Sequence, residues 1–367
     1  MFPLSPDAVL SRLAPLARTP LATLPTPLLP APALAASLRG DIDISIKADA
    51  WTGLGLGGNK VRKLEYELDP ARLRGATDLV TAGGPHSNHC RVTAAAAARL
   101  GLGCTLAVNG EPGDAGRGNA LLHRLLGARI VTVADRAARE AAMTEEASRI
   151  AGMGGKALVV AVGASTPRGA LGYVRAAAEM REQVSAGDCP APRRNPPAIR
   201  GAPDDSGARS EAPVWIFTSS SSGGTLAGLM LGCALMGWRA QLVGVSPDDP
   251  AAKIRAAATE IALGAAALLP HPPRGPDPRA NDLIERVRNV AAATLVTDAF
   301  VGPGYGAPTR TAEEAIALFG ARAGVILDPV YTGKAAAALI AWVREGVVPS
   351  GAHVILLHTG GHPALFR

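Results

Sequence analysis

The chain has few aromatic residues, few lysines and no closely spaced cysteines. Aromatics make up 4% of its 367 residues, and six lysines stand against thirty-one arginines. The four cysteines show no C-x-x-C spacing, which argues against a disulfide framework or a zinc cluster and favours reduced thiols. The N-terminus lacks a basic segment followed by an apolar one, and no uncharged apolar stretch is long enough to span a bilayer. We therefore expect a cytoplasmic protein with no membrane or metal partner.

The positive charge of the chain is spread out rather than gathered. A net charge of +6 comes from scattered arginines, with no dense basic run and no aromatic residues interleaved with one. Proteins that bind nucleic acids concentrate such charge, so no nucleic-acid partner is expected. With 48% hydrophobic and 19% charged residues, the composition is typical of a globular protein of about two domains.

Predicted strands and helices alternate along most of the chain. Strands are expected at 41–47, 78–82, 104–108, 129–133, 157–162, 214–218, 241–246 and 353–357, mostly separated by helices of roughly 10–15 residues, which indicates βαβ units and parallel sheets. The strand at 41–47 alternates polar and apolar residues, so it should be half-buried. The eight prolines of residues 1–40 predict an extended arm leading to a short helix at 33–38. Residues 185–213, rich in Pro, Gly, Arg, Asp and Ser, are read as an insertion without structure.

One lysine follows a pair of glycines at a predicted helix start, in Gly57-Gly58-Asn59-Lys60. In a chain that otherwise uses arginine, a lysine here suggests covalent chemistry, because only a lysine amine forms a Schiff base. In the helix that follows, Val61, Leu64 and Leu68 share an apolar face, and Lys63 is expected on the solvent side, paired with Glu67.

Two predicted strand-to-helix loops carry polar and glycine residues. The loop 219–225 precedes a helix, where free backbone N–H groups and close approach at glycine form an anion cradle, although an ordinary turn is the simpler alternative. In the loop 81–91, Ser87 or Asn88 can cap the next helix, or can bind a carboxylate with hydroxyl, amide and backbone N–H groups. His86 and His89 lack the further ligands of a metal site.

Two tyrosines and a threonine occupy other glycine-punctuated segments. Tyr305 and Tyr331 lie in polar surroundings, which favours phenols presented on loops over turn packing, although both interpretations stay open. Thr359 follows a strand end and can hydrogen-bond a ring nitrogen. A reactive lysine, a phosphate cradle and a ring partner together indicate pyridoxal 5′-phosphate.

Six segments resemble the family of D-cysteine desulfhydrase and 1-aminocyclopropane-1-carboxylate deaminase, which are fold type II pyridoxal-phosphate enzymes related to the tryptophan synthase β subunit. They are GGNKVRKLEYEL (57–68), TAGGPHSNHCR (81–91), SSSGGTLAGL (220–229), GPGYGAPT (302–309), DPVYTGK (328–334) and HTGGHPALF (358–366). The resemblance implies an α/β fold of two open, twisted, mainly parallel sheets flanked by helices. It also implies a large domain (1–56 and 170–367), a small domain (57–169) and a homodimer.

The resemblance assigns roles residue by residue. Lys60 would bind the cofactor covalently and take the Cα proton, Asn88 would contact the pyridoxal O3′, Thr359 would face the ring nitrogen, and the phosphate would lie in the turn Ser222-Gly223-Gly224-Thr225. Lys63 would be a surface residue. Catalytic roles are implied for Lys60, Ser87, Tyr305 and Tyr331, and contacts with an amino-acid substrate are implied for Ser87, Asn88, His89, Tyr305, Tyr331 and Thr332.

The substrate is expected to be D-cysteine. Desulfhydrases of this family carry Thr where Thr332 and Thr359 stand, whereas the deaminases carry Glu and Leu, so β-elimination is favoured over ring opening. The alternatives are 1-aminocyclopropane-1-carboxylate, another D-amino acid, a catalytically silent pyridoxal-phosphate protein, and a protein that binds a different phosphorylated ligand. His86, Ser221 and Leu226 depart from the family pattern, as does the insertion.

Overall fold

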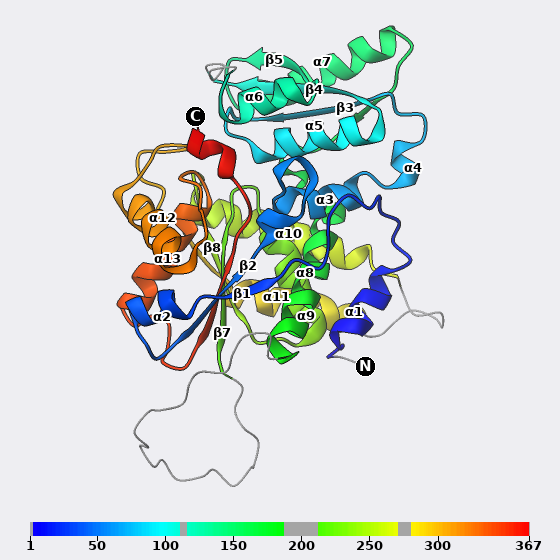
Figure 1. Cartoon of the computed structure of the whole chain (residues 1–367). Coiled ribbons are helices and arrows are strands. Elements are labelled where there is room, and N and C mark those ends of the chain that lie inside the picture. Colours follow the sequence, from blue (N-terminus) through cyan, green and yellow to red (C-terminus); the bar gives the residue numbers. More distant parts are fainter. Residues whose placement is uncertain (1–2, 111–115, 187–211, 271–279, 367) are drawn as a thin grey trace, which may run out of the picture.

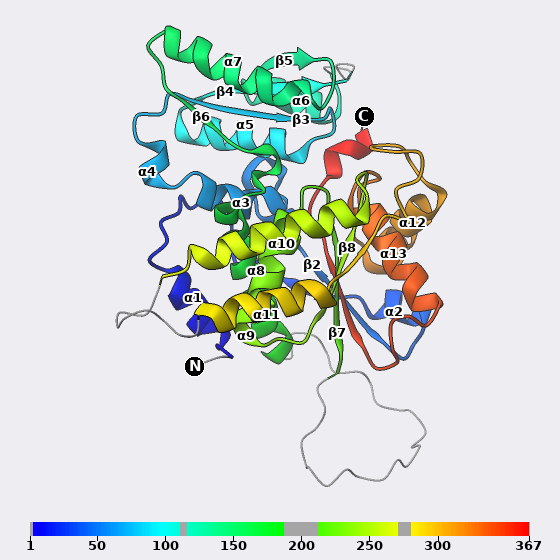
Figure 2. The same cartoon turned by 180° about the vertical axis from the view of Figure 1, so that it is seen from behind.

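The computed structural model describes residues 3–110, 116–186, 212–270 and 280–366, and its described strands form two sheets (Figures 1 and 2). The larger has the order β1 (Leu28–Pro30), β2 (Asp43–Lys47), β10 (His353–Leu357), β7 (Val214–Ser219), β8 (Gln241–Val245) and β9 (Leu295–Thr297). The smaller has the order β5 (Arg129–Val133), β4 (Gly103–Asn109), β3 (Asp78–Gly83) and β6 (Ala157–Val159). Only β1 runs antiparallel to its neighbour; the other pairs are parallel, which confirms the predicted fold class.

Helices cover both faces of the larger sheet. One face packs against α1 (Pro6–Leu13), α8 (Pro167–Ala186), α9 (Gly224–Met236), α10 (Ala251–Ala267) and α11 (Ala280–Ala293). The other packs against α2 (Pro32–Leu38), α12 (Arg310–Ala323) and α13 (Thr332–Arg344). Side chains of a strand alternate between faces, so Ile355 and Leu357 of β10 enter the first core, while Val354 and Leu356 enter the second.

The smaller sheet carries α5 (Asn88–Leu100), α6 (Gly118–Leu125) and α7 (Ala138–Gly152). Figure 1 shows it above the larger sheet, with α3 (Asn59–Glu67) between the two and α4 (Pro70–Leu73) at the side. Apolar residues of α3 and α5 share one core with the smaller sheet, among them Val61, Leu64 and Val92. Helix α3 therefore connects the two halves, while the domain boundaries at 57 and 169 stay a prediction.

Two sequence-based expectations are wrong in the same sense, because they underestimate burial. Strand β2 is not half-buried: Ser45 and Lys47 are as inaccessible as Ile44 and Ile46, since the sheet is covered on both faces. The expected extended arm instead contains the helix α1, which buries Val9 and Leu13 and begins with Pro6 after the cap Ser5. Ser5 as the cap and Pro6 as the first helical residue are a common signal for the start of a helix.

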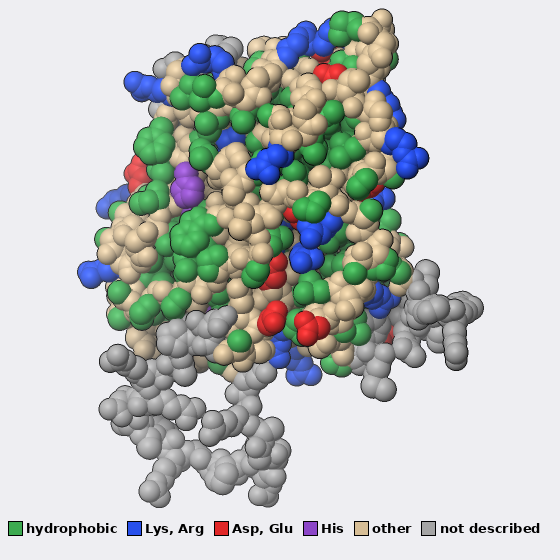
Figure 3. Space-filling view, turned by 45° about the vertical axis from the view of Figure 1, so that its right-hand side comes forward, with side chains coloured by type: hydrophobic (Ala, Val, Ile, Leu, Met, Phe, Trp, Pro, Cys, Tyr) green, Lys and Arg blue, Asp and Glu red, His purple; other side chains and the backbone are tan. Residues whose placement is uncertain are grey.

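Three further expectations concern the insertion, membrane-spanning helices and the distribution of surface charge. The expected insertion lies almost entirely outside the described residues. Within the described ranges, no helix combines the length and apolar character needed to cross a bilayer. Figure 3 shows Lys and Arg side chains dispersed over the face that it presents.

Candidate active site

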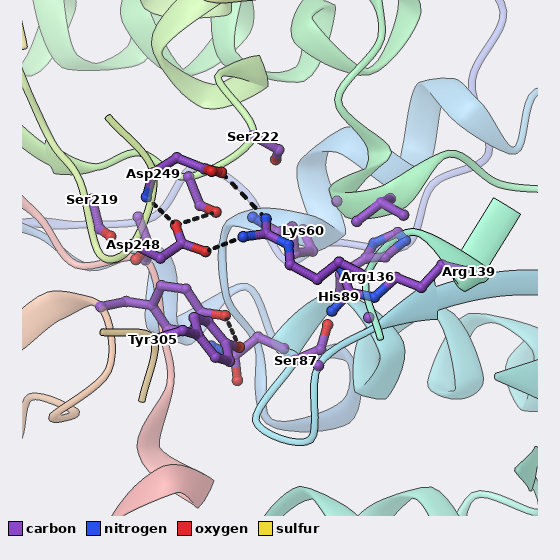
Figure 4. Close-up of a pocket in the computed structure, with 18 of the residues that line it drawn as sticks. Lys60, Ser87, His89, Arg136, Arg139, Ser219, Ser222, Asp248, Asp249 and Tyr305 are labelled. Atoms are coloured by element: carbon purple, nitrogen blue, oxygen red, sulfur yellow. Dashed lines mark hydrogen bonds and ion pairs between the residues drawn. The ribbon is translucent and has the colours of Figure 1, made fainter. Parts of the chain in front are cut away.

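Loops at the carboxyl ends of β3, β7, β8 and β10 meet at a cavity of about 400 Å³ between the two sheets (Figure 4). Parallel sheets place ligand sites at this end of their strands. Its wall includes the predicted residues Lys60, Ser87, Asn88, His89, Ser222, Tyr305, Tyr331 and Thr359. The structure thus brings together residues that are separated by up to 299 positions in the chain.

Lys60 is the second residue of α3. The glycine before this helix packs closely against the backbone of Thr359, which fixes where the helix begins. A Cβ on Gly58, whose φ is +115°, would lie 2.9 Å from the carbonyl oxygen of Thr359. The next residue, Asn59, donates from its backbone N–H to that oxygen (3.1 Å) and from its side chain to Thr225 (3.0 Å). Burial lowers the pKa of Lys60 to about 8. Its amine donates no hydrogen bond to any described residue, which leaves it available for reaction.

The loop before α9 has the features of a phosphate cradle. Helix α9 begins at Gly224, and no side chain caps its first N–H groups. Gly223 adopts φ +79°, and a Cβ on Gly224 would lie 2.7 Å from both the Lys63 amine and the Ser165 hydroxyl. Close approach of a ligand to these N–H groups therefore depends on glycine. The neighbouring Ser219 hydroxyl is buried without a partner among the described residues.

Lys63 corrects the prediction that it lies on the solvent side of α3. It is fully buried, and its amine donates to the Ser165 hydroxyl (2.6 Å), which is 2.6 Å from that of Ser222. Burial, and then the charge of Lys60, hold its pKa well below the ordinary lysine value. Glu67 is buried too, bonded to Thr166, because α3 is packed on both sides. The sequence did contain a hint that Lys63 belongs to the site, because it is a second lysine one turn after Lys60 in a lysine-poor chain.

The loop before α5 caps that helix and also forms part of the cavity wall. Ser87 caps the helix by accepting from the Cys90 N–H (3.2 Å), and it also lines the cavity. The Asn88 side-chain oxygen accepts from Arg91 (3.3 Å). His89 lies 2.8 Å from the Thr81 hydroxyl, and burial with the charges of Lys60 and Lys63 holds its pKa well below the ordinary value. His89 therefore stays neutral.

Tyr305 and Tyr331 form a pair, with their hydroxyls 2.6 Å apart and their ring centroids 6.0 Å apart. Burial raises both pKa values above the ordinary value, so both phenols stay protonated. His86, one of the departures from the family pattern, stacks on Tyr305. Thr332 does not line the cavity: it is fully buried and donates to Asp328 (2.6 Å), so the structure does not place it as a substrate contact.

Charged residues at the cavity wall were not found from the sequence. Arg136, after β5, bridges to Asp248 and Asp249 of the larger-sheet side at 3.2 Å each. Asp248 also accepts from the hydroxyl of Ser221 (3.0 Å), one of the departures from the family pattern. Arg139, at the start of α7, also lines the cavity. These residues follow strands that are distant in sequence, and no local motif connects them.

The donor set fits pyridoxal 5′-phosphate. The uncapped N–H groups of α9, the Ser219 hydroxyl, which has no partner among the described residues, and the amine of Lys63 suit a phosphate dianion. Lys60 supplies the amine that the cofactor aldehyde needs, and Thr359 and Asn88 supply polar groups for the ring.

Comparison with known proteins agrees with this fit and confirms the family noted from the motifs. A family described as pyridoxal-phosphate dependent enzyme matches residues 20–360. A 1-aminocyclopropane-1-carboxylate deaminase of Methylobacterium sp. (strain 4-46) is 35% identical and covers 90% of each chain. A D-cysteine desulfhydrase of Klebsiella pneumoniae subsp. pneumoniae is 34% identical, covering 88% of each. A crystal structure of an ACC deaminase homologue is 29% identical over 98% of this chain and 96% of that one, with a TM-score of 0.74. The chain therefore belongs to the family of pyridoxal-phosphate-dependent enzymes.

Proposed function

We propose that this lyase eliminates hydrogen sulfide from D-cysteine, with pyruvate and ammonia as the other products. The observation that carries the proposal is the Lys60 amine, which bonds to no described residue and has a pKa of about 8, in the same cavity as a pair of protonated phenols. The described acids that line the cavity, Asp248 and Asp249, are both paired with Arg136. β-Elimination needs a base at Cα and a proton donor at the leaving group, and these residues provide both.

The cofactor would be held by groups already in place. Lys60 would bind its aldehyde, Lys63 and the turn from Ser222 to Thr225 would hold the phosphate, and Asn88 and Thr359 would contact the ring. When bound, pyridoxal phosphate supplies an electron sink that acidifies the Cα–H of an attached amino acid. The lowered pKa of Lys60 keeps part of its amine unprotonated near neutral pH, which a base requires.

The substrate would lie between Lys60 and the tyrosine pair. Ser87, with Asn88 and His89, would receive the carboxylate at the start of α5. As the Cα–H bond breaks, its proton passes to the Lys60 amine; the Cβ–S bond breaks with its electron pair on sulfur, which a phenol of the pair protonates. The released three-carbon enamine takes up one water to give pyruvate and ammonia. The tyrosine pair would thus face the leaving sulfur.

Product analysis with D-cysteine, L-cysteine and 1-aminocyclopropane-1-carboxylate tests the proposal, with Lys60→Ala as the inactive control. We expect sulfide and pyruvate from D-cysteine. Release of 2-oxobutanoate from the cyclopropane acid, without sulfide from saturating D-cysteine, would instead assign the deaminase activity that the Methylobacterium relative's name carries. A visible cofactor band with no turnover of any of the three would identify a silent cofactor-binding protein.

We also propose a cytoplasmic homodimer. Trp51, Ile326 and Phe366 surround one hollow at the surface and are 57%, 51% and 71% exposed, which is unusual for large apolar side chains. A second copy of the chain would cover them. Light scattering of the holoenzyme should give twice 37.3 kDa, and the Trp51→Glu variant should shift it to the single mass. A single mass for the wild type would refute the dimer.

A further inference from the structure

Two arginines from the smaller-sheet side line the cavity, and they differ in their partners. Arg136 is neutralised, because its guanidinium bridges Asp248 and Asp249. Arg139 donates from Nε (2.8 Å) and from Nη2 to a single oxygen, the side-chain carbonyl of Asn109. That partner carries no charge. Among the described residues, no Asp or Glu pairs with Arg139, so its positive charge has no counter-ion.

Arg139 faces the substrate end of the cavity. Burial, and then the charge of Arg136, lower the pKa of Arg139, while smaller opposing effects come from Cys90, whose N–H donates to Ser87, and from the phenols of Tyr305 and Tyr331. Figure 4 shows its side chain extending into the pocket, with Ser87 and His89 close by in the view. The phosphate cradle does not need it, because that anion has the start of α9 and Lys63. A substrate carboxylate at this end of the cavity would supply that counter-ion.

We propose that Arg139 binds a carboxylate of the substrate beside Ser87, with Asn109 as its positioning residue. This rests on the proposed function, in which the ligand is an amino acid. Ser87 and Asn88 are neutral, so a carboxylate bound there gains a charge partner from the arginine. Because one oxygen of Asn109 receives both Nε and Nη2, the plane of the guanidinium is held, and Nη1, which donates to no described residue, is left for the ligand.

Steady-state kinetics of the holoenzyme with Arg139→Gln tests the proposal. A lost charge-assisted hydrogen bond should raise the KM for D-cysteine about 10- to 100-fold while kcat changes little. Asn109→Asp should have a similar effect, because an aspartate would pair with Arg139 and compete with the substrate. Arg149→Gln is the matched control: it removes the same charge from the same helix, outside the cavity, where Arg149 pairs with Glu146. Unchanged KM in both Arg139→Gln and Asn109→Asp would overturn the proposal.

Calorimetric titration of the holoenzyme with propionate and succinate gives a readout that needs no turnover, so it remains informative even if D-cysteine is not the substrate. If Arg139 binds the α-carboxylate, Arg139→Gln should weaken both ligands by a similar factor of about ten or more. If it binds the second acid of a dicarboxylic substrate, only succinate should weaken. Equal affinities of wild type and Arg139→Gln for both ligands would refute carboxylate binding by Arg139.

Discussion

Lys63→Met tests whether the second buried lysine of α3 holds the cofactor phosphate. Methionine keeps the length and the apolar contacts of the lysine stem but removes its charge. The Lys63 amine lies 2.6 Å from Ser165, which connects to Ser222 of the cradle. A hydrogen bond to a charged group contributes about 1.5–3 kcal/mol, so the dissociation constant of pyridoxal phosphate should rise about 10- to 150-fold. Absorbance titration of the cofactor-free protein measures this.

The same variant should not lose stability without cofactor. The folded-state pKa of Lys63 is depressed, so between that value and the ordinary lysine pKa the unfolded chain binds more protons. The wild-type apoprotein therefore gains stability as pH rises toward the ordinary pKa, and at pH 7 it carries the cost of the buried amine. Lys63→Met should unfold at an equal or higher temperature at pH 7, with a weaker rise toward pH 10. Lys156→Met, at an exposed lysine, is the control. Wild-type cofactor affinity in Lys63→Met would refute the reasoning.

Three further changes probe the site and its support. Gly224→Ala places a Cβ 2.7 Å from Lys63 and Ser165, so cofactor affinity should fall by about 1–3 kcal/mol in a titration, whereas Gly152→Ala, with open space, should not change it. Asp49→Asn removes the fully buried partner of Arg62 (2.9 Å) and should lower the free energy of unfolding in urea by about 3–5 kcal/mol; a loss below 1 kcal/mol would contradict the assigned ion pair. With the pKa of Lys60 near 8, acylation of the apoprotein at this residue, followed by peptide mass spectrometry, should be half-maximal near pH 8; a plateau already reached at pH 6 would contradict it.

Periodicity and loop chemistry predicted most of the fold and the centre of the site. The alternation of strands and helices indicated parallel sheets, and glycine or serine at strand ends marked the loops around Lys60, Ser87 and Ser222. A hydrophobic period identifies one buried face of an element, but it does not say whether a second element covers the other face. That is why β2 and α3 were expected to be half-exposed, and why Lys63 was placed in solvent.

The charged wall of the cavity could not be predicted for a different reason. Asn109 ends β4, Arg136 and Arg139 follow β5, and Asp248 follows β8, so Arg136 meets Asp248 only when the two sheets come together. Each is an ordinary polar residue at or after a strand end or at a helix start. A single sequence gives such residues no period and no spacing, so their pairing depends on the tertiary arrangement alone.

The two lysines of α3 are the same residue type, but their different hydrogen-bond partners suit them to different roles in the site. Both are desolvated within one helical turn, yet Lys60 makes no hydrogen bond to a described residue, and Lys63 is bonded to Ser165. The charge of Lys60 adds to burial in lowering the pKa of Lys63, so the cofactor-free site disfavours two ammonium groups at once. A phosphate dianion at Gly224 would stabilise the protonated form of Lys63 and leave Lys60 as the group that gives up its proton. The anion that the cradle binds would thereby also select which lysine reacts.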